Sequence, residues 1–215
     1  MKRWVTVILA LTLAGTAQAA FPAWPYVGTM TGPQSTACVL IVPGGAGPMM
    51  SAARQPNGAP IDGSIHVQLV DWLGVPIAGF AQGDIWLEFA GSATHLMSCR
   101  NPASADFLPD GNSDQNGWVH FSNPLSGGGW AEGPVTVYIN GTPALTVDDV
   151  EWPSIPLQVN SPDINGDGYM NLLDVSVFVG DLWGAYHLRS DLGRDGLVNL
   201  ADIPLLIEYM GDRCQ

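Results

Sequence analysis

The chain has 215 residues and a formal net charge of −13, from 20 acidic residues against 7 lysines and arginines. Such a surface repels nucleic acid and anionic membranes, so we expect neither as a partner. The length has room for one sandwich-sized domain and one small module.

The N-terminus has the features of a secretory signal peptide. Lys2 and Arg3 precede an apolar run over 5–14, and Ala17 and Ala19 mark a cleavage site. The run is shorter than the roughly 20 residues that a bilayer-spanning helix needs. We therefore expect residues 1–19 to be removed, and the mature chain to be exported and to bind no membrane.

Residues 20–160 predict an antiparallel β-sandwich. Glycine and proline are frequent, and apolar residues alternate with polar ones, a pattern typical of sandwich strands. Asn140-Gly141 predicts a tight hairpin turn. The segments 99–117 and 126–129 are expected to be a long loop and a flexible insertion. Strands are expected within Ala37–Val42, Ser64–Val70, Asp84–Phe89, Trp118–Phe121, Val135–Ile139, Leu145–Val150 and Ile155–Val159.

Two turn patterns flank strands in this region. Asp71-x-x-Gly74-x-Pro76-x-x-Gly79 follows the run 64–70, and Asp114-x-x-Gly117 precedes the run 118–121. Together they resemble bacterial immunoglobulin-like (Ig-like) domains of the invasin and intimin type. The resemblance implies an Ig-like sandwich that serves as a spacer, adhesion or recognition module without catalytic residues.

The polar side chains form no catalytic pattern. The four histidines (His66, His95, His120 and His187) have no HExxH spacing, and Ser126 lies in no nucleophile elbow. A carboxylate pair for glycoside hydrolysis can always be assembled from so many acids, which is weak support for one. We therefore expect no enzymatic activity.

Three aromatic side chains lie on nominally outward faces of the expected strands: Trp86, Trp118 and Tyr138. Side by side, they would form a flat platform for sugar rings, which makes polysaccharide an alternative ligand. The competing interpretation is that a strand, a loop or the C-terminal module covers them, because aromatic rings fill such contacts well.

The three cysteines leave at least one thiol unpaired or in an intermolecular bond. Cys38 and Cys99 lie in the same expected domain, so we favour that pair. The alternative is that Cys214 ties the C-terminal tail back onto this domain.

Two similar loops, 163–174 and 191–202, follow near the C-terminus. Both place oxygen-bearing side chains at positions 1, 5, 9 and 12 and a glycine at position 6 (Gly168 and Gly196), and the first also has one at position 3, Asn165. Ca²⁺ takes six to eight oxygen ligands, and position 7 of such a loop supplies a backbone carbonyl. The predicted ligands are Asp163, Asn165, Asp167, Tyr169, Asn171 and Asp174 in the first loop, and Asp191, Asp195, Leu197, Asn199 and Asp202 in the second.

We expect two Ca²⁺ sites of unequal strength. The second loop has Gly193 at position 3 and the cation Arg194 beside it, so it lacks one ligand and the first site should bind more tightly. The competing interpretation is that clusters of aspartate, asparagine and glycine are simply turns. Two loops in register, each followed by a helical pattern, make that interpretation weaker.

An amphipathic helix pattern follows each loop. Apolar residues recur at i, i+3, i+4 and i+7, which predicts one buried face on each helix. The apolar residues at position 8 of the two loops, Met170 and Val198, are expected to form a short strand contact. The two faces comprise Val175, Phe178, Val179 and Leu182, and then Ile203, Leu206, Ile207 and Met210.

The segment 161–215 resembles the type I dockerin domain, which has two EF-hand-like calcium loops. Asp174 and Asp202 at position 12 carry the resemblance, together with the absence of a full helix before the first loop. It implies a secreted bacterial protein, bound by cohesin modules in extracellular, often polysaccharide-degrading, assemblies. The family's usual Ser/Thr and Lys-Arg contact residues are replaced here by Leu172-Leu173, Leu200-Ala201, Val179-Gly180 and Ile207-Glu208.

The passage between the two parts contains Pro153, Pro156 and Pro162, which stiffen the chain. We expect the module to extend the sandwich rigidly and to contact it through Leu172, Leu173 and Trp183. The sequence thus predicts a secreted, non-catalytic calcium-binding protein that interacts with a cohesin-like protein or with its own copies. The alternatives are a sugar-binding module carried on a dockerin, and a subunit of a surface layer or filament.

Overall fold

The computed structural model describes residues 24–90, 95–100 and 107–215. The expected signal peptide at 1–19 lies outside these residues. In the part that is described, no helix is long and apolar enough to cross a membrane.

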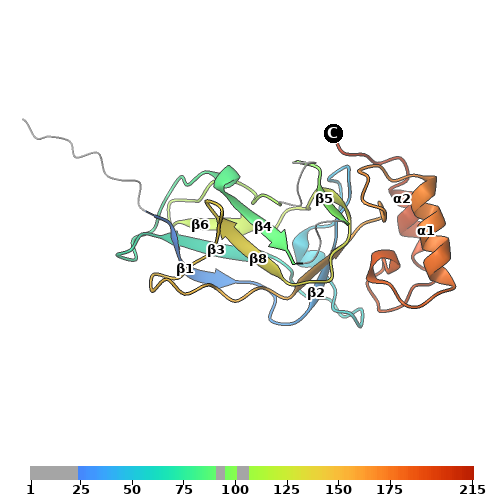
Figure 1. Ribbon diagram of the computed structural model, residues 1–215, viewed down its shortest axis with the longest axis horizontal. Helices are drawn as coiled ribbons and strands as arrows, with labels where there is room; N and C mark the ends of the chain where they lie inside the picture. The colour runs from blue at the N-terminus through green and yellow to red at the C-terminus, as the bar shows by residue number, and fades with distance from the viewer. Residues whose placement is uncertain (1–23, 91–94, 101–106) are drawn as a thin grey trace, which may run out of the picture.

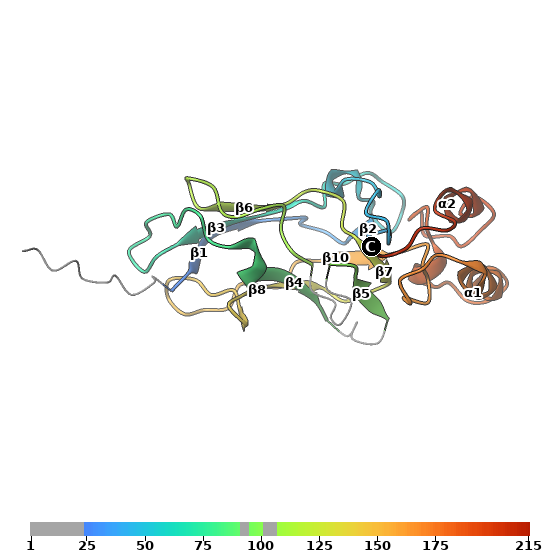
Figure 2. The same cartoon turned by 90° about the horizontal axis from the view of Figure 1, so that it is seen from above.

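Short strands form a two-layered body with two helices at one end (Figure 1). Figure 2 shows β1, β3 and β6 in one layer and β4 and β8 in the other. The sheet orders are β1-β3-β6, β4-β8-β9, β10-β2 and β5-β7. The elements are β1 (Tyr26–Thr31), β2 (Ala37–Leu40), η1 (Met50–Ala52), β3 (Ile65–Val70), η2 (Gln82–Asp84), β4 (Ile85–Phe89), β5 (Leu96–Ser98), β6 (Trp118–Phe121), β7 (Gly127–Gly129), β8 (Val135–Ile139), β9 (Thr142–Pro143), β10 (Leu157–Asn160), α1 (Leu172–Leu182), η3 (Leu188–Ser190) and α2 (Ile203–Glu208).

The first core lies between the two layers. Alternate residues of β3, β4 and β8 are buried while their neighbours are half-buried or exposed, as a sheet with one covered face requires. The predicted mainly-β sandwich is therefore confirmed. Central members of this core are Ile65, Val67, Leu69, Ile85, Leu87, Phe89, Val135, Val137 and Ile139.

Most of the expected strand runs form strands, but the run Leu145–Val150 does not. Thr146 accepts hydrogen bonds from the backbone N–H groups of Asp148 and Val150, and Asp149 has a φ of 58°, so this run is a tight turn. Strands β1, β5, β7 and β9 lie outside the predicted runs. The sandwich is also not wholly antiparallel, because β10 pairs with β2 in parallel.

The predicted turns are present with the expected chemistry. Asn140 and Gly141 have φ values of 51° and 84° and join β8 to β9, as the hairpin prediction requires. The Asp71 carboxylate accepts hydrogen bonds from the backbone N–H groups of residues 73 and 75. Asp114 accepts equivalent bonds from residues 116 and 118. The two patterns are therefore the same structural device.

The glycine-rich segment 126–129 is not the flexible insertion that its composition predicts. Gly127–Gly129 forms β7 and pairs with β5. A Cβ atom on Gly127 would lie 2.5 Å from the carbonyl oxygen of Met97. The glycines in this segment let two backbones approach closely, and they do not make the segment flexible.

A second, smaller core lies between the two helices and the end of the sandwich. Position 2 of each loop, Ile164 and Leu192, and the equivalent helix residues Phe178 and Leu206 are buried in it. Leu40 of β2 belongs to this core, whereas Val39 belongs to the first. β2 is thus buried on both faces, and its apolar run reflects its position between two cores.

The helix faces are narrower than predicted. Val179 and Ile207 are 48% and 67% exposed, and α2 ends at Glu208, before Met210. The predicted strand contact at position 8 is wrong too. The backbone of Met170 bonds to Gly211 and Asp212 of the C-terminal tail instead of to Val198.

Candidate functional site

The loop 163–174 (loop 1) is organised by the carboxylates at its two ends. Asp163 accepts backbone N–H groups from Gly166, Asp167 and Gly168 at 3.0, 3.2 and 2.8 Å. Asp174 accepts those of residues 165 and 171 at 3.1 and 2.8 Å. Asn171 also caps α1, because its side chain accepts the N–H of residue 173. The loop therefore wraps around two inward-facing carboxylates.

The loop 191–202 (loop 2) repeats this arrangement at equivalent positions. Asp191 accepts the N–H groups of Asp195 and Gly196 at 3.0 and 2.8 Å. Asp202 accepts those of Gly193 and Asn199 at 2.7 and 2.9 Å. The glycine at position 6 has a φ near 85° in both loops. The sequence repeat is thus a repeat of backbone geometry.

The carboxylates at positions 1 and 12 of both loops are at most 1% exposed. Burial raises the pKa of Asp163 to about 6, and the negative charge of Asp174 adds to the effect. Burial also raises the pKa values of Asp174 and Asp202. Each loop therefore holds carboxylates in an environment that disfavours their charged form unless a cation lies beside them.

The predicted ligands of each loop belong to one hydrogen-bonded loop, and they comprise more than carboxylates. Carboxylate, side-chain amide and backbone carbonyl oxygens are the mixture that Ca²⁺ accepts. In the described residues, no group of three or more His, Cys, Asp or Glu side chains is placed to hold a metal ion. Each predicted set includes three aspartates, and in this structure their carboxylates are not grouped around one point but accept backbone N–H groups of their own loop. The types of donor atom in the two loops are those that a hard cation takes.

Loop 1 packs directly against the β5–β7 ribbon of the sandwich. The N–H of Gly129 donates to the carbonyl of Asp163 at 2.7 Å. A Cβ atom on Gly128 would lie only 1.9 Å from a carboxylate oxygen of Asp163. Only glycine leaves room for the carboxylate at this position.

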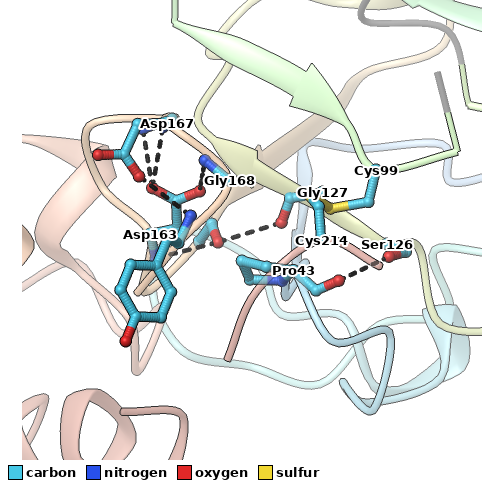
Figure 3. The surroundings of a disulfide bond; sticks show 11 residues. Pro43, Cys99, Ser126, Gly127, Asp163, Asp167, Gly168 and Cys214 are labelled. Atoms are coloured by element: carbon cyan, nitrogen blue, oxygen red, sulfur yellow. Dashed lines mark hydrogen bonds between the residues drawn. A yellow bond between two sulfur atoms is a disulfide. The ribbon is translucent and has the colours of Figure 1, made fainter. Parts of the chain in front are cut away.

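A disulfide between Cys99 and Cys214 closes the same contact (Figure 3). The backbone N–H of Cys214 donates to the carbonyl of Gly168, at position 6 of loop 1. The favoured pairing of Cys38 with Cys99 is therefore wrong, and the alternative that ties the C-terminal tail to the sandwich is present. Cys38 is a free, buried thiol, and burial raises its pKa to about 12.

Loop 2 contacts the sandwich through polar groups. The Asn160 side chain donates to the carbonyls of Leu188 and Asp191 at 3.0 and 2.5 Å. Arg194, at position 4, has a φ of 55° and is 8% exposed, and it donates to the carbonyl of Ala52 at 3.4 Å. Its side chain thus extends from the loop to the sandwich.

The expected sandwich contacts of Leu172, Leu173 and Trp183 are not made. These side chains are 76%, 60% and 84% exposed. The contact between the C-terminal segment and the sandwich, which we call the inner face, is made instead by polar groups, glycines and the disulfide. The sequence does not predict Gly128 and Asn160 as docking residues, whereas it leaves the attachment of Cys214 to the sandwich as an alternative. Leu200 and Ile207, from the second half of the repeat, are also 68% and 67% exposed.

The three aromatic residues of the predicted sugar platform are not brought together. Trp86 and Tyr138 stack on each other on paired strands β4 and β8, with ring centroids 5.7 Å apart. Each ring therefore occupies one face of the other. Trp118 lies on β6 in the opposite layer. A continuous three-ring platform is excluded by this separation.

No family model and no curated protein matches the chain. Two solved structures show a distant likeness. The Lin-41 filamin domain is 15% identical, covers 60% of this chain and 89% of its own, and gives a TM-score of 0.28. A type II cohesin–X-dockerin complex from Acetivibrio cellulolyticus, an N-terminal interface mutant, is 18% identical, with coverages of 60% and 82% and a TM-score of 0.25. Scores this low carry no argument about function.

Proposed function

We propose that this is a secreted, non-catalytic protein in which a dockerin-like, EF-hand-like calcium module anchors an Ig-like sandwich to a protein partner outside the cell. The observation that carries the proposal is the outer face of the module. We define this outer face as Leu172, Leu173, Trp183, Leu200 and Ile207, all at least 60% exposed. Both halves of the loop repeat contribute to it.

Calcium binding is supported by the donor chemistry of the two loops. Carboxylates at positions 1 and 12 are buried, and the raised pKa values of Asp163, Asp174 and Asp202 follow from that burial. A bound Ca²⁺ would supply the positive charge that these groups lack. The predicted ligand sets, starting at Asp163 and Asp191, would hold one ion each. Extracellular modules use such sites at Kd values of order 0.1 to 1 mM.

A protein partner is supported by the chemistry of the outer face. Contiguous exposed apolar side chains mark interaction sites, and we propose that the five residues of the outer face form such a surface. Tryptophan is enriched among the residues that dominate binding energy. The partner that we propose is a cohesin-type module with an apolar surface. The strongly acidic character of this chain favours a partner with basic residues at the rim of that surface.

The test is binding of the mature chain to a panel of type I and type II cohesin modules, by biolayer interferometry in Ca²⁺ and then in chelator. Leu173→Ser combined with Trp183→Ser should abolish binding. Trp72→Ser is the matched control, because Trp72 is 70% exposed but lies in the Asp71 turn of the sandwich. Calcium-dependent binding that only the double variant loses supports the proposal.

Two other outcomes would replace the cohesin partner. Self-association in sedimentation velocity that the double variant loses would identify a second copy of the chain as the partner, as in a surface layer or filament. Retention on insoluble polysaccharide that Trp118→Ala abolishes would favour the sugar-binding alternative. A monomer that binds neither cohesins nor polysaccharide would overturn the anchoring function.

A further inference from the structure

Two histidines face each other on the exposed side of the β3–β6 pair. His66 and His120 are direct partners in the antiparallel register. Their Nδ1 atoms are 2.7 Å apart, and the ring centroids are 4.9 Å apart at an angle of 70°. Both rings are accessible, and neither belongs to the calcium loops or to the outer face of the module.

The surroundings of this pair are suited to a cation. The rings line a shallow depression of about 310 Å³ together with Thr31, Asp114 and Trp118. Asp62 lies close enough to His66 for an electrostatic effect. The pKa of Asp62 is lowered mainly by hydrogen bonds from Ser64 and, to a smaller degree, by the nearby His66. Two carboxylates therefore flank the histidine pair in a chain with a net charge of −13, and they favour approach of a cation.

We propose that His66 and His120 form a two-imidazole binding site for a transition-metal cation of the Cu²⁺ or Ni²⁺ class. Neutral imidazole is the commonest metal ligand in proteins, and nitrogen ligands suit these ions better than Ca²⁺. This site would thus differ chemically from the two calcium loops, because it has nitrogen ligands on the sandwich and the loops have oxygen ligands.

The distance between the nitrogens favours tetragonal over tetrahedral coordination. Two nitrogens about 2.0 Å from one ion lie about 2.8 Å apart at a right angle, and about 3.3 Å apart in a tetrahedron. The observed 2.7 Å nearly matches the first value. Binding requires both rings in the tautomer that carries its proton on Nε2, with small rotations to direct both Nδ1 lone pairs at the ion.

The competing interpretation is a hydrogen bond between two neutral rings with no ligand. That bond is consistent with the same distance, but it is solvent-exposed and contributes little, on the order of 1 kcal/mol. Its loss is a small cost against two metal–nitrogen bonds. Since no third His, Cys, Asp or Glu side chain completes a group in the described residues, water completes the coordination, and the affinity is expected in the micromolar range.

The test uses the calcium-saturated mature chain, titrated with Cu²⁺ by calorimetry and followed by electron paramagnetic resonance. We expect one site whose spectrum shows hyperfine splitting from two nitrogens. His66→Ala and His120→Ala should each weaken this site at least tenfold. His95→Ala is the matched control, because His95 is exposed and stacks on Trp130, away from this pair.

Circular dichroism melts of each variant establish that the sandwich is still folded. His120→Asn, which retains a polar side chain on the strand, must lose binding as His120→Ala does. Copper binding that is equal in wild type, His66→Ala and His120→Ala would overturn the site, and so would a spectrum without nitrogen splitting. Copper that binds only at the chain terminus or in the loops would give equal binding in the wild type and in both variants.

Discussion

The two faces of the C-terminal segment differ in how they are built. The inner face meets the sandwich through close polar and backbone contacts, exemplified by Gly128 against Asp163, Asn160 against loop 2, and the Cys99–Cys214 disulfide. The outer face is apolar and exposed, with Trp183 at 84%. The comparison shows that the more hydrophobic face of a module need not be the face that docks onto its own chain.

Under the function proposed above, this difference corresponds to two separate roles. We expect the inner contacts to set the stability of the docked module, and the outer residues to contribute little to folding. Substitutions on each face separate these two roles, and those on the inner face should cost the most stability.

Among the contacts of the inner face, loss of the disulfide should have the largest effect. The bond joins residues 115 positions apart, and removal of a native disulfide costs about 2–4 kcal/mol. Cys99→Ser combined with Cys214→Ser should lower the free energy of unfolding by that amount, measured in urea. Cys38→Ala is the control, because it removes a cysteine but keeps the bond. A double variant as stable as this control would show that the tail is held by its other contacts alone.

Calcium removal should have the next largest effect. At a concentration one hundred times the Kd, a ligand that binds only the folded state stabilises it by about 2.7 kcal/mol. Thermal melts in Ca²⁺ and in chelator should therefore differ clearly in the transition of the module. Limited proteolysis should leave the segment 150–162 intact in Ca²⁺ and cleave it in chelator. Equal melts would rule out the loops as calcium sites, and rapid cleavage in saturating Ca²⁺ would show a mobile module.

Gly128→Ala tests the close approach on the inner face. The new methyl group would overlap the Asp163 carboxylate, and such overpacking costs about 1–3 kcal/mol. Gly83→Ala is the matched control, because a Cβ atom there meets nothing within 4 Å. Stability measured in urea should fall for the first variant only. Equal stabilities would mean that loop 1 shifts away from the sandwich without cost.

The two loops should differ in calcium affinity. Loop 2 has Gly193 where loop 1 has Asn165, so it has one side-chain ligand fewer. In calorimetry, Asp163→Ala and Asp167→Ala should each lower the total calcium affinity more than Asp191→Ala, by roughly tenfold, or about 1.4 kcal/mol. Equal losses would show that water or another group replaces the missing ligand.

Local patterns in the sequence were sufficient for much of this structure. Alternation predicts β6 and β8 at their observed bounds, and Asn140-Gly141 predicts the tight turn between β8 and β9. These features depend on neighbours in the sequence, because turn chemistry and pleating are local.

Contacts between distant segments could not be predicted in this way. The role of Gly128 depends on a carboxylate at residue 163, and glycine-rich sequence alone favours flexibility. The pairing of Cys99 with Cys214 depends on how the C-terminal segment docks. The error over Leu172 and Trp183 came from the assumption that apolar residues are buried. An exposed side chain is common on folded surfaces, and only a cluster of them carries information.

Substitutions on the outer face should have the smallest effect on stability. Leu173→Ser and Trp183→Ser remove side chains that are 60% and 84% exposed and lie outside both cores. Surface changes of this kind usually alter the free energy of unfolding by less than about 0.5 kcal/mol. Phe178→Ala, on the buried side of α1, is the contrasting variant, and it should cost about 3–5 kcal/mol. Urea unfolding in Ca²⁺ measures all three. A loss above 1 kcal/mol for Trp183→Ser would show that this side chain stabilises the fold. The outer face would then not be a surface that is free for a partner.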